Sequence, residues 1–340
     1  MATHAGKICG VAEAAARLRS PFAHEEFSPL LGETPLIVDL AQAAPGLSGA
    51  ETSAFASALS TLPCPTIGWT DRAGAAAAPL SEHFDLLLDD DSDLETVLGW
   101  VERRPLASMA AAQLMRHSQD ADLHEALIAE SLVYSTLQSG PEFAAWLAGR
   151  GAPRTRPSNP EPAVLVERDG DRLALTFNRP EKRNAFSAQM RDALAEGLRI
   201  AQADESLQVV LRGAGDAFCS GGDLDEFGTV PDPATAHAIR STRNAGRILS
   251  SIAPRVRVEL HGACVGAGIE LPAFAGRVAA RPDAFFQLPE VSLGLVPGAG
   301  GTASLPRRIG RQRTLYMALT GHRIDAPTAL AWGLVDELSD

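Results

Sequence analysis

The sequence predicts an α/β protein built from two parts. Short apolar runs of strand length and amphipathic stretches of helical length both occur, and they alternate along residues 163–340. Strands that alternate with helices form sheets covered by helices, and strands buried on both faces are apolar throughout. In residues 1–150 the strands come first and a run of helices follows, so the two parts are organised differently.

The boundary between the parts is the stretch "GRGAPRTRPSNPEPA", residues 149–163. It contains four prolines and three arginines but few large apolar side chains, which is typical of an exposed connector. We therefore expect an N-terminal part at 1–150, a linker at 151–162 and a C-terminal part at 163–340.

The N-terminal part begins with candidates for buried strands. The runs "PLIVDL" (35–40) and "HFDLLLDD" (83–90) are apolar and short, and "PTIGW" (65–69) is a weaker candidate. Residues 49–62 between the first two runs have helical spacing. Such lengths and compositions distinguish strands from helices.

From residue 92 to 149 the pattern is helical. Ser92 and Glu95 have the spacing of a capping box, and the stretches after them are amphipathic. We find no catalytic cluster among residues 92–149 and interpret this segment as a structural or assembly module.

The C-terminal part alternates strands and helices. A hairpin with its turn at Asp169-Gly170 comes first, and an amphipathic helix and further strands follow it. The predicted segments are the hairpin at 163–177, the helix at 187–204, and strands within 207–213, 255–262 and 277–290.

The overall composition excludes several classes of partner. The net charge of −12 argues against nucleic acid and anionic membrane surfaces, and no apolar run approaches the roughly 20 residues of a membrane span. The four cysteines and eight histidines lack metal-ligand spacing. We expect a cytoplasmic protein with free thiols and with no metal site, membrane segment or nucleic-acid partner.

Two glutamates lie in apolar surroundings. Glu270 precedes "LPAFA", and Glu290 follows Leu288-Pro289 and precedes "VSLGLV". Burial disfavours a carboxylate and raises its pKa toward the range of a general acid or base. The alternative for each is an ordinary glutamate in an exposed turn.

Two loops of small residues accompany these glutamates. "CSGGDL" follows the strand at 207–213, and "GAGIE" at 266–270 begins a predicted helix. Small residues let backbone N–H groups face a cavity and let a ligand approach the chain. Paired carboxylates beside such donors suit the addition of water to, or the movement of protons on, a carbon next to a thioester carbonyl.

Four stretches together resemble the signature blocks of the crotonase (enoyl-CoA hydratase/isomerase) superfamily. They are "FNRPEKRNAFS", "AFCSGGDLDEF", "HGACVGAGIEL" and "PEVSLGLVPGAGGTASLPRRIG", in the order and at the spacing of that family. The resemblance extends from about Ala163 to the end of the sequence. It implies a crotonase-like ββα spiral fold for this part and an acyl-CoA thioester substrate, with coenzyme A as part of the substrate and no separate cofactor.

The resemblance also implies roles for individual residues. The backbone N–H groups of Ser220 and Ala267 would bind the thioester oxygen, although the family has glycine where Ala267 stands. Glu270 would deprotonate the water that attacks Cβ, and Glu290 would exchange the proton at Cα. The implied reaction is syn addition of water to a 2-enoyl-CoA.

A further set of positions matches the family's substrate and CoA-binding region. These residues are Lys182, Arg183, Asn184, Ala185, Gly221, Gly222, Asp223, Gly266 and Gly298. A solvated turn is the alternative reading for the side chains of Lys182 and Arg183.

The sequence departs from the family in the order of its parts. Family members continue past the point that matches Asp340 with helices that cover the site and build a trimer, and residues 92–149 resemble those helices. The N-terminal part is therefore expected to be a degenerate or permuted crotonase-like module, whose helices replace the C-terminal ones on their own or a neighbouring chain. We expect a homo-oligomer, trimer or hexamer, and the N-terminal module also suits a protein partner.

Other functions remain open at this point. An enoyl-CoA isomerase would need Glu290 but not Glu270, and an acyl-CoA thioester hydrolase would release free CoA. A non-catalytic acyl-CoA-binding subunit of a complex is the alternative outside enzymes.

Overall fold

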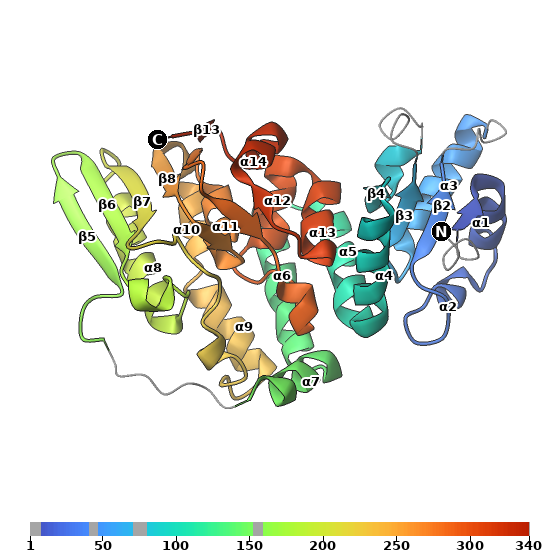
Figure 1. The fold of residues 1–340 in the computed structure, drawn as a ribbon, viewed down its shortest axis with the longest axis horizontal. Helices are drawn as coiled ribbons and strands as arrows, with labels where there is room; N and C mark the ends of the chain where they lie inside the picture. The colour runs from blue at the N-terminus through green and yellow to red at the C-terminus, as the bar shows by residue number, and fades with distance from the viewer. Residues whose placement is uncertain (1–7, 41–46, 71–79, 152–158, 340) are drawn as a thin grey trace.

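A computed structural model describes residues 8–40, 47–70, 80–151 and 159–339. One sheet of each part of the chain lies toward either end of the long axis, and helices from both parts lie between these two sheets (Figure 1). The chain is an α/β protein, as the sequence predicts. Most of the linker predicted at 151–162 lies outside the described residues.

The N-terminal sheet is small and entirely parallel, with its strands in the order β1-β2-β3-β4. It confirms the three predicted strands and adds β1, which the sequence pattern does not predict because Ile8-Cys9-Gly10 is not part of a longer run of large apolar residues. The strands are β1 (Ile8–Gly10), β2 (Leu36–Asp39), β3 (Thr66–Trp69) and β4 (Leu86–Leu88).

Both faces of this sheet are buried. Leu36 and Val38 of β2 belong to the apolar cluster that includes helices α1 (Val11–Leu18) and α3 (Gly49–Thr61). Ile37, between them, points to the opposite face and belongs to the large core of the molecule, because successive side chains of a strand alternate in direction.

Four helices follow in the predicted run: α4 (Asp91–Arg103), α5 (Pro105–Asp120), α6 (Leu123–Gln138) and α7 (Pro141–Arg150). The predicted cap of α4 is wrong. Asp90, not Ser92, caps this helix, since its Oδ1 accepts the N–H of Ser92 at 2.9 Å. A carboxylate two residues earlier satisfies free N–H groups of the helix start.

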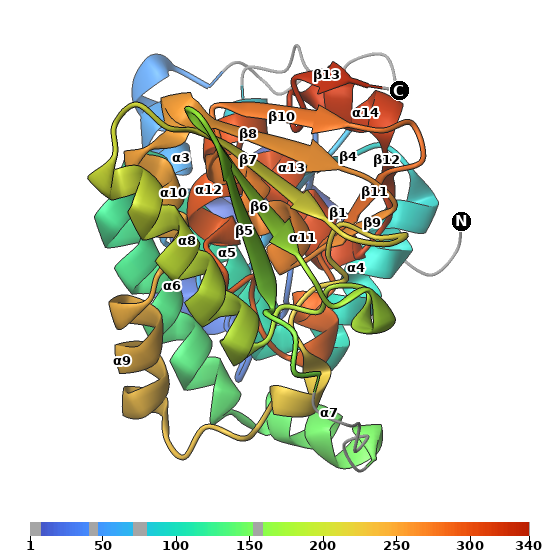
Figure 2. The same cartoon turned by 90° about the vertical axis from the view of Figure 1, so that its left-hand side faces the viewer.

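The C-terminal part contains a six-stranded sheet in the order β13-β10-β8-β7-β6-β5. The strands are β5 (Val164–Asp169), β6 (Arg172–Phe177), β7 (Gln208–Gly213), β8 (Val256–Leu260), β10 (Arg277–Ala280) and β13 (Glu337–Leu338). All pairs are parallel except the β5–β6 hairpin, whose turn contains Gly170 at φ 60°. Figure 2 shows this sheet in front of the central helices.

A second sheet of three strands continues from the first, in the order β12-β11-β9. Its strands are β9 (Ala263–Val265), β11 (Phe285–Gln287) and β12 (Ile324–Asp325). The helices of this part are α8 (Ala188–Ala203), α9 (Pro233–Thr242), α10 (Ala245–Ser251), α11 (Ala267–Glu270), α12 (Gly301–Ile309), α13 (Arg311–Thr320) and α14 (Ala326–Trp332). The short helix α11 leaves β9 directly and carries Glu270 at its end.

Helices α4 to α6 pack on residues 163–339 of their own chain. Arg104 Nε donates to the carbonyl of Ser292 at 3.1 Å, and Arg307 Nη2 donates to the carbonyl of Ala121 at 2.6 Å. Leu114 and Leu127 belong to the same buried core as the C-terminal strands. The N-terminal helices are thus an integral layer of the molecule. That they replace the family's C-terminal helices stays a prediction.

No helix within the described residues has both the length and the apolar character needed to cross a membrane.

Candidate active site

Two backbone loops meet at the ends of β7 and β9. Cys219 and Cys264 form a parallel bridge, in which the N–H of Val265 donates to the carbonyl of Cys219 at 3.0 Å. A Cβ built on Gly266 would lie 3.6 Å from the Cα of Gly221. The two loops of small residues predicted from the sequence are therefore adjacent.

The oxyanion role predicted for Ser220 needs a correction. The N–H of Ser220 donates to the carbonyl of Arg183 at 3.0 Å, so it is not available to a substrate oxygen. Phe186 instead pairs with Gly222 and bonds to the flanking residues, donating to the carbonyl of Gly221 and accepting from the N–H of Asp223. In a parallel bridge a residue bonds to the two neighbours of its partner, and the partner's own N–H points away from it. Phe186 therefore leaves the N–H of Gly222 unused, and this N–H is the better candidate donor.

Ala267 stays a candidate donor to the substrate oxygen, on the loop adjacent to that of Gly222. It is the first residue of α11, and the N–H of a first helical residue has no acceptor within the helix. Ala267 and Gly222 both line the cavity described below. The alanine that replaces the family's glycine is thus accommodated without closing the site.

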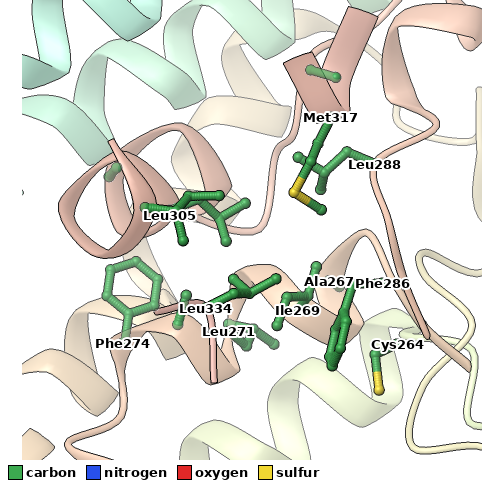
Figure 3. Close-up of a cluster of buried hydrophobic side chains, with 14 of the residues drawn as sticks. Cys264, Ala267, Ile269, Leu271, Phe274, Phe286, Leu288, Leu305, Met317 and Leu334 are labelled. Atoms are coloured by element: carbon green, nitrogen blue, oxygen red, sulfur yellow. The ribbon is translucent and has the colours of Figure 1, made fainter. Parts of the chain in front are cut away.

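Glu270 is held rigidly inside the protein. Its side chain is 2% exposed, and its Oε2 accepts the N–H groups of Ala299 at 2.7 Å and Gly301 at 2.9 Å. Figure 3 shows the apolar cluster around α11, which includes Ile269 of the helix itself and Leu271 and Phe274 of the residues that follow it. Burial, and then the charges of Glu290 and Glu130, raise the pKa of Glu270 well above its ordinary value.

Glu290 begins the 3-10 turn η6 (Glu290–Leu293). Its Oε2 is buried and has no hydrogen-bond partner among the described residues. Burial raises the pKa of this carboxyl to about 8, so it is largely protonated at neutral pH. A Cβ built on Gly266 would lie 2.4 Å from Glu290 Oε1, which places the carboxyl directly over the loop that leads to Ala267.

Both carboxyl groups face one cavity of about 210 Å³. The predicted site residues that line this cavity are Gly222, Asp223, Ala267, Glu270, Glu290 and Gly298. The volume is below the roughly 300–1,000 Å³ of drug-sized ligand sites. The cavity therefore suits the acyl end of a ligand better than a whole acyl-CoA.

The remaining predicted residues do not line this cavity in the part of the chain that the structure covers. They are Lys182, Arg183, Asn184, Ala185, Ser220, Gly221 and Gly266. Lys182 Nζ donates to Asp223 Oδ2 at 2.7 Å, so the expectation of a cation free to meet CoA phosphates is weakened.

The side chain of Asn184 serves the fold of the turn. It is fully buried, its Oδ1 accepts the N–H of Arg179, and its Nδ2 donates to the carbonyls of Ala214 and Ala217. Both ends of the amide are occupied, so a direct contact between this side chain and substrate is not supported.

Sequence reasoning missed the residues that the N-terminal part contributes. Glu130 and Tyr134 of α6 line the cavity, and Arg240 of α9 lies over the Tyr134 ring at 4.7 Å. Glu130 is 3% exposed and is the third buried carboxyl of the site. The signal that marked Glu270, a lone acid in an apolar run, was also present at Glu130 in "ALIAESLV".

Gly298 keeps Tyr134 in place. A Cβ at residue 298 would lie 2.3 Å from the Tyr134 ring, so Gly298→Ala is expected to displace the ring and reduce turnover by about tenfold or more. Steady-state kinetics with an acyl-CoA thioester, the substrate class that the sequence resemblance implies, would measure the change. Gly149→Ala is the matched control, because a Cβ there meets nothing within 4 Å; equal rates for both variants would contradict the prediction.

The described ranges contain no cluster of three or more His, Cys, Asp or Glu side chains able to hold a metal ion. All four cysteines are free and buried. What the site offers is acid–base chemistry from carboxyl groups and hydrogen bonds from backbone N–H groups.

Fold and site together define an α/β protein with a buried pair of carboxyl groups beside two backbone donors. The profile of the enoyl-CoA hydratase/isomerase family matches residues 171–339. A 2,3-dehydroadipyl-CoA hydratase of Escherichia coli (strain K12) is 36% identical over 176 residues, which cover 52% of this chain and 68% of that protein. The chain therefore belongs to the enoyl-CoA hydratase/isomerase family.

Other similar proteins include an isomerase and a second hydratase. A 1,2-epoxyphenylacetyl-CoA isomerase of Escherichia coli (strain K12) is 35% identical over 173 residues, 49% of this chain and 66% of that protein. The crystal structure of an enoyl-CoA hydratase from Thermoplasma volcanium GSS1 has 34% identity and a TM-score of 0.49, covering 53% of this chain and 73% of that one. The chain spans about two thirds of the length of the curated relatives named here.

Proposed function

We propose that the protein is an enoyl-CoA hydratase-like lyase, which adds water to the double bond of a 2-enoyl-CoA. The observation that carries this proposal is the placement of Glu270 and Glu290 on one cavity. One carboxyl group accepts two backbone N–H groups, and the other has a buried oxygen without a partner among the described residues. Their environments therefore differ, as an acid and a base require.

The proposed reaction divides the work between these groups. Glu270, in its ionised form, takes a proton from a water molecule as the water oxygen bonds to Cβ. The double-bond electrons move toward the thioester, and the enolate oxygen accepts hydrogen bonds from the N–H groups of Gly222 and Ala267. The proton of Glu290 is transferred to Cα on the same face. The two carboxyl groups end with exchanged protonation states and are reset by proton exchange.

Glu290 is suited to the acid role. Its pKa of about 8 keeps the proton on the carboxyl at neutral pH, and no described protein acceptor competes for the proton at Oε2. Burial and the neighbouring carboxyl groups raise the pKa of Glu270, and its two N–H donors oppose that rise; the base step uses the ionised fraction of this carboxyl group. The names of the relatives include both a hydratase and an isomerase, so isomerisation is the second candidate.

Glu270→Gln separates these two candidates. A hydratase is expected to lose about 100-fold or more of its rate, because the variant has no base to activate water. An isomerase that uses Glu290 alone would lose little. Purified protein is assayed with crotonyl-CoA for hydration and with a 3-enoyl-CoA for isomerisation. An unchanged hydration rate in the variant would refute the role of Glu270.

Two further alternatives give separate readouts in the same assay. An acyl-CoA hydrolase would release free CoA, which thiol titration detects. A non-catalytic subunit would bind acyl-CoA but remain inactive unless a second polypeptide is added. Sedimentation of the active protein tests the expected trimer or hexamer.

A further inference from the structure

The start of helix α12 is held by two carboxyl groups from distant parts of the chain. Glu270 Oε2 accepts the N–H groups of Ala299 and Gly301 at 2.7 and 2.9 Å. Glu130 Oε1 accepts the N–H of Gly300 at 2.7 Å, and its Oε2 accepts the N–H of Thr302 at 2.9 Å. Four successive N–H groups thus alternate between the two glutamates.

We propose that Glu130 is a positioning residue of the active site, which holds the 299–302 turn so that this turn fixes the carboxyl group of Glu270. The proposal rests on the function proposed above, since it assigns Glu270 a part in the reaction. It makes the chemistry depend on a side chain from the N-terminal part, 170 residues before the turn that it holds.

The contacts of Glu130 exceed those of an ordinary helix cap. Thr302 Oγ1 adds a third hydrogen bond, donating to Glu130 Oε2 at 2.7 Å. Glu130 is 3% exposed as a whole residue and lines the same cavity as Glu270 and Glu290. A shift of the 299–302 turn therefore moves both donors of Glu270 together, and a misplacement of about 1 Å costs up to 100-fold in rate.

Glu130 also sets the electrostatics of the site. The charged and titratable groups that face it are Arg240 of α9, Tyr134 of its own helix, Glu270 of α11 and Glu290 of η6. Burial raises the pKa of Glu130 to about 7. Its negative charge in turn raises the pKa of Glu270 and of Glu290. Removing that charge should move both titrations to lower pH.

The first test is Glu130→Gln. The amide keeps the size of the side chain but turns one acceptor into a donor that opposes the N–H of Gly300 or Thr302. We expect kcat to fall about 10- to 100-fold with little change in KM. We also expect the acid and alkaline limbs of the pH–rate profile to move to lower pH.

Glu130→Asp separates position from charge. It keeps the negative charge but shortens the side chain by one methylene, so kcat should fall while the limbs of the profile stay near those of wild type. Glu142→Gln is the matched control. Glu142 is also buried and accepts two backbone N–H groups at a helix start, from Leu106 at 2.7 Å and Ala107 at 3.1 Å, but it does not line the cavity formed by the described residues. This control should lose stability without a shift of the pH profile.

A measurement without substrate distinguishes failure of this proposal from failure of the proposed function. Carboxyl carbons of ¹³C-labelled glutamate, assigned with the Gln variants, report the titration of Glu270 and Glu290 by NMR. If wild type hydrates no enoyl-CoA, the proposed function fails, but lower titration midpoints in Glu130→Gln still support the electrostatic coupling. Unchanged midpoints, together with an unchanged kcat, would overturn the role of Glu130.

Discussion

Replacing Glu290 with glutamine is expected to reduce hydration and double-bond isomerisation alike, by about 100- to 10,000-fold. Both reactions need proton transfer at Cα, since hydration adds a proton there and the isomerisation of a 3-enoyl-CoA removes one. Glu290 is the carboxyl group whose buried oxygen has no competing partner among the described residues. Steady-state kinetics with a 2-enoyl-CoA and a 3-enoyl-CoA measure both losses. Glu167→Gln, at an exposed position of β5, should leave both rates unchanged.

The same substitution should alter how stability depends on pH. The pKa of Glu290 is about 8 in the folded protein and near its ordinary value of 4.5 in the unfolded chain. Between these values the unfolded chain has released the proton and the folded protein still holds it. Raising the pH through this window therefore lowers the free energy of unfolding.

Glu290→Gln removes this contribution, so its free energy of unfolding should fall less steeply between about pH 5 and 8 than that of wild type. Urea unfolding at several pH values measures the difference. The pKa values of Glu130 and Glu270 are also raised. The free energy of unfolding of the variant should therefore still fall with rising pH, but less steeply. Identical slopes for variant and wild type would show that Glu290 is ionised in the folded protein.

Asp85→Ala is expected to give the largest loss of stability, about 3–5 kcal/mol. Asp85 is 1% exposed and precedes β4. Its Oδ2 accepts the N–H of Thr66 at 2.8 Å, and its Oδ1 accepts from Arg116 Nε at 2.9 Å and Arg311 Nη1 at 3.0 Å. The carboxylate thus connects the N-terminal sheet, helix α5 and helix α13.

Alanine at position 85 would leave two largely buried guanidinium groups without this carboxylate, which explains the size of the effect. Asp85→Asn keeps one acceptor oxygen and should therefore lower the free energy of unfolding less than Asp85→Ala does. Asp204→Ala is the control, because Asp204 pairs with Arg168 at the surface, where ion pairs contribute little. Urea unfolding followed by tryptophan fluorescence compares the three variants, and a wild-type midpoint for Asp85→Ala would exclude the proposed connection.

The sequence was sufficient for those features that depend on local pattern. The strands β2 to β8 and the hairpin follow from short apolar runs and a turn glycine, and Glu270 and Glu290 were found because each acid interrupts an apolar segment. Strand β1, like β4, has three residues, but β4 lies in the apolar run of 83–90 whereas β1 ends at Gly10 and has no such run around it.

Features that depend on distant contacts could not be obtained in this way. Whether Ser220 or Gly222 presents its N–H to the cavity is decided by the pairing of Phe186 with Gly222, and a one-residue change of register reverses the direction of every group. Glu130 showed the same local signal as Glu270. Its place in the site is fixed by a turn 170 residues later, and nothing in α6 itself indicates that partner.

The order of the parts along the chain affects how the protein folds during synthesis. Helices α4 to α6 leave the ribosome long before the surface that covers them, since Glu130 and Gly300 are 170 residues apart. At about 5–20 residues per second, the wait lasts roughly 10–30 s. During that time Met115 and Leu127, both of which end in the core, are without their final neighbours. A nascent chain in this condition is expected to be a client of chaperones that bind apolar helices.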